Sequence, residues 1–393
     1  MQLLILTDRE YPCSESFLRE VYSKRFPEQG DHIGFVMYDS VGPRREERWN
    51  GCPVYVLPES DYRYRRAVAD YVSESPGPLE WVLDEFGPPD VVQVRNHLSM
   101  GLYGITLAEQ FGVPFFYRVS HLMPEAVGLS SAHPSVSGRL VGAAQCLAGR
   151  VVRRKLLDEA ERVLPISETM DQYLGTESKS TISPMGVNTR ADLFARPRAF
   201  RDQFDLPSSG TTLLYLGKLS RRRNPAFLVG VLAAVLDRLD ASLVVVGGER
   251  ASRVRAVEEQ AEELGASDRV TVTGWIDDQE MVAGAIESAD VGLSPLPLNR
   301  VYRCSSPTKV LEYLNHATPA VVSPVPDQAT IVEASGGGIV AEYDPKPFAD
   351  AVVELCTSDG RDCRGADGRA YVREHRSYDI ICERIRPTYT NYV

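Results

Sequence analysis

The sequence lacks an apolar run that approaches the roughly 20 residues needed to span a bilayer. Its first residues, from Met1 to Asp8, lack the basic stretch and the apolar length of a secretory signal. The seven cysteines are scattered, odd in number and not arranged in CxxC pairs or Cys/His clusters. Because disulfide frameworks pair an even number of cysteines, reduced thiols are expected. We therefore expect a soluble, cytoplasmic protein without a metal site.

An excess of positive charge is also missing. The chain has 43 Lys and Arg against 54 Asp and Glu, a net charge of −11, which argues against a nucleic-acid surface. Any anionic ligand must therefore be held by a local basic cluster. With 393 residues the chain is longer than one hydrophobic core usually supports, so two domains are expected.

Short apolar runs alternate with helical patterns in two successive arrays. This alternation predicts parallel sheets covered by helices, in two Rossmann-like domains that face a central cleft. We place the first domain at 1–188, the second at 189–376, and a last helix at 377–393 that returns to the first domain. The expected strands are 3–6, 33–38, 54–57, 91–94, 115–119 and 163–166, then 213–216, 243–246, 270–273, 291–294, 320–323 and 338–341.

The segment that begins at Cys304 combines a helix start with a carboxylate. Ser306 is a typical N-cap residue, and Pro307 suits the first helical position, where its missing N–H costs nothing. The backbone N–H groups near Ser305 and Ser306 would then favour a phosphate. Glu312 lies further along the helix and suits ribose hydroxyls. A sugar-nucleotide site is one interpretation, and an ordinary capped helix before a strand is the other.

Glycines and cations follow the strand expected at 213–216. Gly217 lets a ligand approach the backbone, while Lys218 and Arg223 place positive charge beside it. A solvated basic turn is the alternative. Two further strand ends carry Gly247 and Gly274-Trp275. They are candidates for ligand binding, and the alternative is a plain turn at Gly247 and a packing role for Trp275.

Three polar residues of the first half also follow expected strands. His121 comes just after 115–119 and is the best placed of the six histidines to meet a substrate, although a structural histidine is as common an outcome. Glu15 and Ser16 follow the first strand in a less distinctive loop. Ligands of such sheets bind beyond the carboxyl ends of strands, where these residues fall.

An ordered set of short motifs resembles one enzyme family. Taken together, these motifs are similar to those of glycosyltransferases of the GT-B fold, specifically the retaining family 4 (glycosyl transferases group 1). The resemblance covers most of the chain and is clearest over 163–345. The segments that carry it are 164–168 (LPISE), 183–188 (SPMGVN), 216–219 (LGKL), 245–248 (VVGG), 272–275 (VTGW), 289–295 (ADVGLSP) and 309–314 (KVLEYL).

The resemblance implies roles for individual residues. Lys218 and Arg223 would grip the donor diphosphate, Lys309 lies in the KVLEYL segment of the donor site, and Glu312 would bind the ribose hydroxyls. Cys304 stands where the family has a second glutamate that contacts the transferred sugar, and the glycine-rich loop expected after the first strand is missing. His121 matches the histidine that such enzymes place beside the transferred sugar.

The activity implied is hexosyl transfer, with retention, from a nucleotide-diphosphate sugar as co-substrate, without a metal or cofactor. No Asp-x-Asp motif is present. One alternative is a degenerate scaffold or nucleotide-sugar-binding protein, which Cys304 suggests. The other is an enzyme with the same fold but different chemistry. Sugar-nucleotide epimerases lack the Lys309–Leu314 signature, and phosphorylases need a longer chain.

The acceptor is left open among small molecules, lipid-linked compounds and glycans. Arg150, Arg153, Arg154 and Lys155 flank apolar residues such as Val151 on the first domain. Such a pattern usually forms a solvated amphipathic helix; peripheral contact with an anionic membrane is the alternative.

Overall fold

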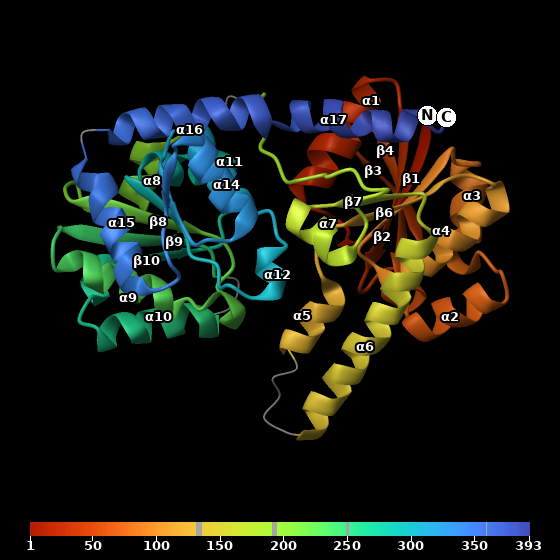
Figure 1. The fold of residues 1–393 in the computed structure, drawn as a ribbon, viewed down its shortest axis with the longest axis horizontal. Coiled ribbons are helices and arrows are strands. Elements are labelled where there is room, and N and C mark those ends of the chain that lie inside the picture. Colours follow the sequence, from red (N-terminus) through yellow and green to blue (C-terminus); the bar gives the residue numbers. More distant parts are fainter. Residues whose placement is uncertain (131–135, 191–194, 249–250, 359) are drawn as a thin grey trace. The chain divides into compact units, whose positions relative to one another are not determined.

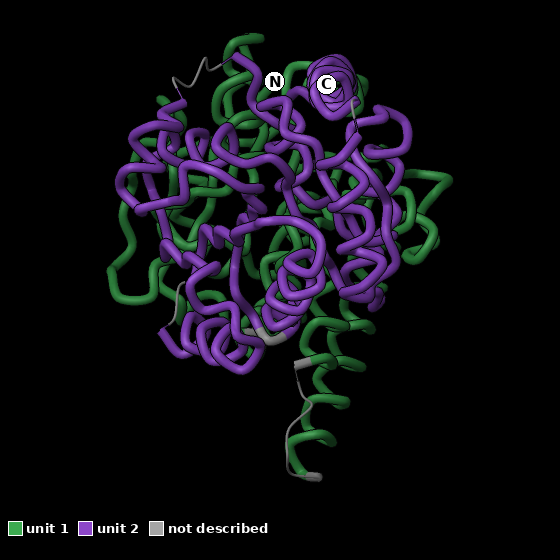
Figure 2. The backbone as a smooth tube through the Cα atoms, turned by 90° about the vertical axis from the view of Figure 1, so that its left-hand side faces the viewer, with its two compact units in different colours: residues 1–184, 378–393 green, residues 185–377 purple. Residues whose placement is uncertain are grey.

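The computed structural model describes residues 1–130, 136–190, 195–248, 251–358 and 360–393. The chain forms two compact units (Figure 2). The first unit comprises residues 1–184 and 378–393, and the second comprises residues 185–377. The last segment of the chain thus belongs to the first unit.

The first unit is built on a seven-stranded sheet with the order β3-β4-β2-β1-β5-β6-β7 (Figure 1). All neighbouring strands are parallel except β3 and β4. The edge strand β3 was not predicted from the sequence, because it consists mostly of charged residues and contains no apolar run. The strands are β1 (Gln2–Glu10), β2 (His32–Asp39), β3 (Arg45–Trp49), β4 (Cys52–Pro58), β5 (Val91–Arg95), β6 (Phe115–Val119) and β7 (Arg162–Pro165).

Helices pack against this sheet, and the final helix, α17, packs among them. The Tyr389 hydroxyl lies 2.7 Å from the Tyr22 hydroxyl in the core, and Arg25 forms an ion pair of 3.1 Å with Asp379. The return of the last helix to the first domain, as predicted, is therefore observed. The helices are η1 (Leu18–Arg25), α1 (Phe26–Glu28), η2 (Glu59–Tyr62), α2 (Tyr64–Val72), η3 (Gly77–Leu79), α3 (Glu80–Phe86), α4 (Leu98–Phe111), α5 (Met123–Ser130), α6 (Val136–Glu159), α7 (Glu168–Leu174) and α17 (Tyr378–Thr390).

The second unit contains a six-stranded, wholly parallel sheet with the order β10-β9-β8-β11-β12-β13. Its strands lie close to the predicted ranges, because strands buried on both faces appear in the sequence as continuous apolar runs. They are β8 (Thr211–Leu216), β9 (Ala241–Val246), β10 (Val270–Gly274), β11 (Val291–Ser294), β12 (Ala320–Val322) and β13 (Gly338–Val340).

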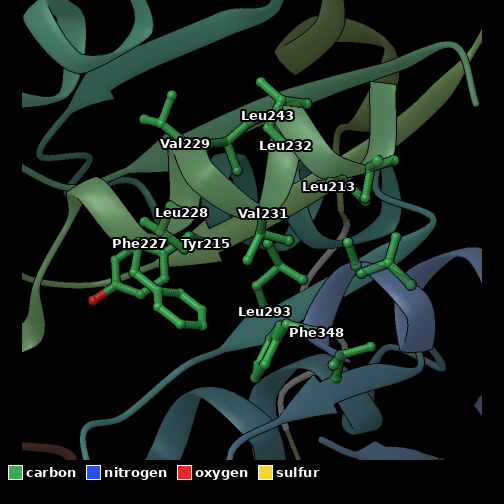
Figure 3. Close-up of a cluster of buried hydrophobic side chains, with 14 of the residues drawn as sticks. Leu213, Tyr215, Phe227, Leu228, Val229, Val231, Leu232, Leu243, Leu293 and Phe348 are labelled. Atoms are coloured by element: carbon green, nitrogen blue, oxygen red, sulfur yellow. The ribbon is translucent and has the colours of Figure 1, made fainter. Parts of the chain in front are cut away.

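The core of the second unit lies between this sheet and its helices (Figure 3). Leu213, Leu243 and Leu293 of three strands and Phe348 of α15 are fully buried. Phe227 stacks on Tyr343 at 4.4 Å between ring centroids. The helices of this unit are α8 (Pro197–Gln203), η4 (Arg221–Arg223), α9 (Ala226–Leu236), α10 (Ala251–Glu263), η5 (Ser267–Arg269), α11 (Gln279–Glu287), α12 (Arg300–Arg303), α13 (Thr308–Asn315), α14 (Pro326–Ser335), α15 (Pro345–Thr357) and α16 (Arg361–His375).

Among the described residues, no helix combines the length and the hydropathy needed to cross a membrane.

Candidate functional site

Three glycines bring the ends of β8, β9 and β10 into close contact. Gly217 and Gly247 have φ of 130° and 143°, which L side chains rarely adopt. A Cβ on Gly247 would lie 2.1 Å from the Gly217 carbonyl oxygen. The Gly217 N–H donates to Val246, and the Gly247 N–H donates to the Gly274 carbonyl at 2.9 Å. These two amides are therefore already hydrogen-bonded. The glycines allow the backbones of the strand ends to lie close together, and their N–H groups are not available to a ligand.

Two cations face Gly217. A Cβ on this residue would lie 3.0 Å from a guanidinium nitrogen of Arg223 and 3.6 Å from the ammonium nitrogen of Lys309. Arg223 comes from η4 and Lys309 from the first turn of α13. The buried lysine beside Gly217 is thus Lys309, whereas the Lys218 side chain is exposed.

Lys309 is only 6% exposed, and its Nζ has no hydrogen-bond partner among the described residues. It lies 3.8 Å from the centroid of the Tyr215 ring, whose face attracts cations. Burial holds the pKa of Lys309 well below its ordinary value, and the Arg223 charge lowers it further, while Glu312 opposes them. A buried amine without an acceptor is costly unless an anion is bound.

Glu312 lies one helical turn after Lys309 and is half-buried. Burial raises the pKa of its carboxyl group, and the Lys309 charge opposes this shift. The residues that the structure describes give the carboxyl group neither a hydrogen bond nor a salt bridge. Its oxygens are therefore available to a ligand hydroxyl.

Arg223 is held by two tyrosines. Burial opposes its charge, but interactions with the hydroxyl groups of Tyr215 and Tyr302 raise its pKa. The Tyr215 hydroxyl also donates to the Lys218 carbonyl oxygen at 3.3 Å. The result is a permanent positive charge in a fixed place. We name these residues the Lys309 cluster: Tyr215, Gly217, Arg223, Tyr302, Lys309 and Glu312.

Tyr313 fixes α13 against the sheet. Its buried hydroxyl accepts from the Leu216 N–H at 2.8 Å and lies 3.3 Å from the Leu214 and Leu293 carbonyl oxygens. Gly292 makes room for the ring, because a Cβ there would lie 2.3 Å from it. Since Lys309 and Glu312 belong to the same helix, Tyr313 sets their position relative to the end of β8.

The helix start differs from the prediction. Helix α13 begins at Thr308 with Pro307 as its N-cap, so the assignment of Ser306 as N-cap is wrong. The Ser306 hydroxyl instead accepts from the Met185 N–H at 3.1 Å, and the Ser305 N–H donates to the Tyr302 carbonyl. The Ser305 amide, predicted as a phosphate donor, is therefore already bonded. Cys304 is buried, with 2% exposure, at the end of α12.

The other predicted donor residues lie at the end of β10. Gly274 has a φ of 74° and open space on its Cβ side. The Trp275 ring is 55% exposed, and its N–H donates to Asp277 at 2.7 Å. An exposed ring beside the glycine ends can stack on a planar ligand.

A second polar cluster occupies the carboxyl ends of β1, β5 and β6 in the first unit. The Asn96 side chain, on a residue with φ of 56°, accepts from the Ser120 N–H at 2.8 Å and the His121 N–H at 3.1 Å. Buried Arg95 pairs with Asp8 and lies 3.6 Å from Glu15. The predicted residues His121 and Glu15 are thus linked to this cluster. Ser16 accepts from the Tyr378 hydroxyl at 2.8 Å and so also serves the packing of α17.

Sequence reasoning missed most of this second cluster. Burial would raise the pKa of Asp8, but Arg95, Arg9 and Asn96 together lower it, so the carboxylate is ionised. His97 caps α4 through Nδ1, and its ring meets the Tyr62 ring edge-on at 5.1 Å. The signal was present in the sequence, because Asp8 and the run Arg95-Asn96-His97 each follow an apolar strand.

Two α/β units, each built on a largely parallel sheet, form the architecture of the GT-B fold class. The family model described as "Glycosyl transferases group 1" matches residues 210–358, and the "Glycosyl transferase 4-like domain" matches residues 20–179. The chain belongs to this family, so the resemblance found in the sequence is confirmed.

Solved structures of the same fold include sucrose-phosphate synthase from Thermosynechococcus elongatus. It superposes with a TM-score of 0.76 at 19% identity and covers 100% of this chain and 99% of that one. HepE from Anabaena, solved in complex with UDP, gives a TM-score of 0.73 at 14% identity, with 100% of both chains covered. These likenesses confirm the predicted fold class.

Curated relatives include the D-inositol 3-phosphate glycosyltransferase of Xylanimonas cellulosilytica, which is 27% identical over 294 residues, 71% of this chain and 66% of that protein. A GDP-mannose-dependent alpha-(1-6)-phosphatidylinositol dimannoside mannosyltransferase of Mycobacterium tuberculosis is 31% identical over 179 residues, 46% of this chain and 44% of that protein. The matched segments thus span 66% or less of these two relatives.

Proposed function

We propose that the protein transfers a glycosyl group from a nucleotide-diphosphate sugar to a hydroxyl group of an acceptor, with retention at the anomeric carbon. The proposal depends chiefly on Lys309, whose buried ammonium group has no acceptor in the described ranges and lies beside the Arg223 guanidinium. Two cations against a glycine backbone suit a diphosphate, because the missing side chain lets the phosphates approach closely.

In the proposed reaction, the bond between the anomeric carbon and the diphosphate oxygen breaks. The acceptor oxygen bonds to the same face of that carbon, and its proton passes to the departing diphosphate. Negative charge grows on the leaving group, where Lys309 and Arg223, with exposed Lys218 nearby in the chain, would stabilise it without a metal ion. Glu312 would hold the ribose hydroxyls, and His121 would orient the sugar.

We infer that the acceptor is polyhydroxylated. Both relatives are named for acceptors that contain inositol. In the first unit, ionised Asp8 and the Tyr62 hydroxyl, which has no hydrogen-bond partner within the described part of the chain, offer an acceptor and a donor to a polyol. Small-molecule and lipid-linked polyols both agree with this inference.

The test is a panel of nucleotide-diphosphate sugars assayed for hydrolysis and for transfer to inositol phosphates, with the anomeric configuration of the product measured by NMR. We expect one nucleotide to raise the Tm and one donor to be consumed. Lys309→Met should lose both effects, while the exposed control Lys346→Met should keep them. Full activity in Lys309→Met would refute the site.

A binding protein without turnover is the second candidate, because Cys304 replaces the glutamate that the family uses to contact the transferred sugar. It would show the same Tm increase with a nucleotide diphosphate but neither hydrolysis nor transfer with any donor. The two candidates therefore separate in a single pair of assays.

A further inference from the structure

The helical pair α5–α6 of the first unit carries an uncovered apolar face. The second half of α6 is anchored, since Arg153, Leu156 and Leu157 are buried. The middle of α6 packs on α5, with Gly128 near Cys146 and Gly149 near Pro124, and Gly149 also lies near Leu98 of α4. In both views the first half of α6 extends beyond the sheet of its own unit (Figures 1 and 2).

Six large apolar side chains of this pair are exposed, Met123 at 36% and five others at 45% or more. Leu140, Leu147 and Val151 are 67%, 65% and 64% exposed, and Val141 and Leu129 are 57% and 45% exposed. Leu140, Leu147 and Val151 fall at helical spacing, so they share one face of α6. We name these five residues the α6 stripe. Contiguous exposed apolar patches of this kind mark interaction sites.

The charge around the α6 stripe is opposite in sign to that of the whole chain. Residues 126–157 contain no Asp or Glu, although the chain carries 54 of them. The same stretch contains Arg139, Arg150, Arg153, Arg154 and Lys155. Glu125 just precedes it and is held ionised, with a pKa lowered to about 2, where burial is outweighed by the bond from Arg153. Glu125 is shared by Arg150 and Arg153, while Arg154 and Lys155 pair with Asp158 and Glu159 at the end of α6, so the five cations meet three carboxylates and a smaller surplus of positive charge remains.

We propose that the α6 stripe docks the protein on a membrane that contains anionic phospholipid. An amphipathic helix with apolar and basic residues binds in the interface with its apolar face among the acyl chains and its cations at the headgroups. The long side chain of Arg139 can reach the headgroups while the leucines insert. This proposal goes beyond the transfer reaction and does not depend on it.

A second copy of the chain fits the α6 stripe less well. In a symmetric pair of α6 helices, Arg139 would meet either its own counterpart or the basic end at Arg154. Arg154 is already paired with Asp158, but residues 126–157 hold no carboxylate that could balance two Arg139 side chains brought together. Anionic lipid supplies the missing negative charge.

The experiment is co-sedimentation of the full chain with vesicles of phosphatidylcholine alone and of phosphatidylcholine with phosphatidylglycerol. We expect binding to the anionic vesicles only, weakened by salt. The double variant Leu140→Asp/Leu147→Asp should lower the partition coefficient about tenfold or more, since two charges would enter the interface. Arg139→Glu should lower it less. The control Val41→Asp changes a still more exposed apolar residue of the same unit, which is 93% exposed, and should bind like the parent.

Two results would overturn the proposal. One is equal sedimentation with and without phosphatidylglycerol, or none with either vesicle. The other is a parent protein that is dimeric by light scattering, becomes monomeric in Leu140→Asp/Leu147→Asp and ignores vesicles, which would assign the stripe to a second copy. Because both leucines are exposed, we expect the Tm values of the variants to equal that of the parent, and this measurement establishes that the variants are folded. Loss of vesicle binding with intact glycosyl transfer would separate this proposal from the proposed function.

Discussion

Replacing Lys309 by methionine should stabilise the free protein and weaken its binding of nucleotide diphosphates. Methionine keeps the length and apolar stem of the side chain but removes the buried ammonium group. A buried polar group without a hydrogen bond costs about 1–3 kcal/mol, and the contact with the Tyr215 ring returns about 0.5–2 kcal/mol. We therefore expect the free energy of unfolding to rise by about 1 kcal/mol.

The gain should depend on pH. Because the pKa of Lys309 is lower in the folded protein than in the unfolded chain, the unfolded chain binds more protons between these two pKa values. The free-energy cost of burying the Lys309 ammonium group is then fully present below the pKa of the folded protein and vanishes above the pKa of the unfolded chain, about 10.4. The difference between Lys309→Met and the parent should therefore shrink as the pH rises, while Lys346→Met should show no such trend.

Binding should change in the opposite direction. A hydrogen bond to a charged group contributes about 1.5–3 kcal/mol, so the Kd for a nucleoside diphosphate should rise about 10- to 150-fold. Urea unfolding at several pH values and isothermal titration calorimetry measure the two effects. A variant that is less stable than the parent and binds the nucleotide with unchanged Kd would refute the assignment of Lys309 as an anion site held ready in the free protein.

Three further substitutions test the remaining parts of the site. Glu312→Gln should weaken the binding of a ribonucleoside diphosphate but hardly change the binding of pyrophosphate, and calorimetry with both ligands tests this. Equal losses of affinity for the two ligands would show that Glu312 does not bind the ribose. Tyr313→Phe leaves the Leu216 N–H unpaired and should lower the free energy of unfolding by about 1–3 kcal/mol and raise KM for the donor; an unchanged KM would show that Tyr313 does not position α13. Cys304→Glu puts a carboxyl group at a site with 2% exposure, so Tm should fall and activity should not improve; a stable variant with higher turnover would show instead that the site still accepts the family's glutamate.

The parallel strands were predictable because each is an apolar run between helical patterns. The strand at Arg45–Trp49 was not, since an exposed edge strand needs only one partner and carries charged residues. The helix at Arg361–His375 was not predictable either, because its composition is largely polar and gives no clear apolar periodicity.

The site was predictable in its residue types but not in its contacts. Arg223, Lys309 and Glu312 were recognisable because each lies beside a strand end or in the KVLEYL segment. That Lys309 is buried against Tyr215 depends on the packing of α13 on β8, which no local pattern encodes. The N-cap error at Ser306 has the same origin, because local propensity favoured a cap and the Met185 N–H, distant in sequence, engaged the hydroxyl instead.

The membership of α17 in the first unit has a consequence for biosynthesis. The second unit is one continuous segment, residues 185–377, so all of it is synthesised before residues 378–393. The first unit needs residues 378–393, and until they emerge the aromatic residues that Tyr389 covers, Tyr22, Phe26 and Phe116, stay open to water. The part of the protein that is translated first is therefore the part that is completed last, and a chain that ends at residue 377 contains the whole second unit but lacks the segment that covers the core of the first.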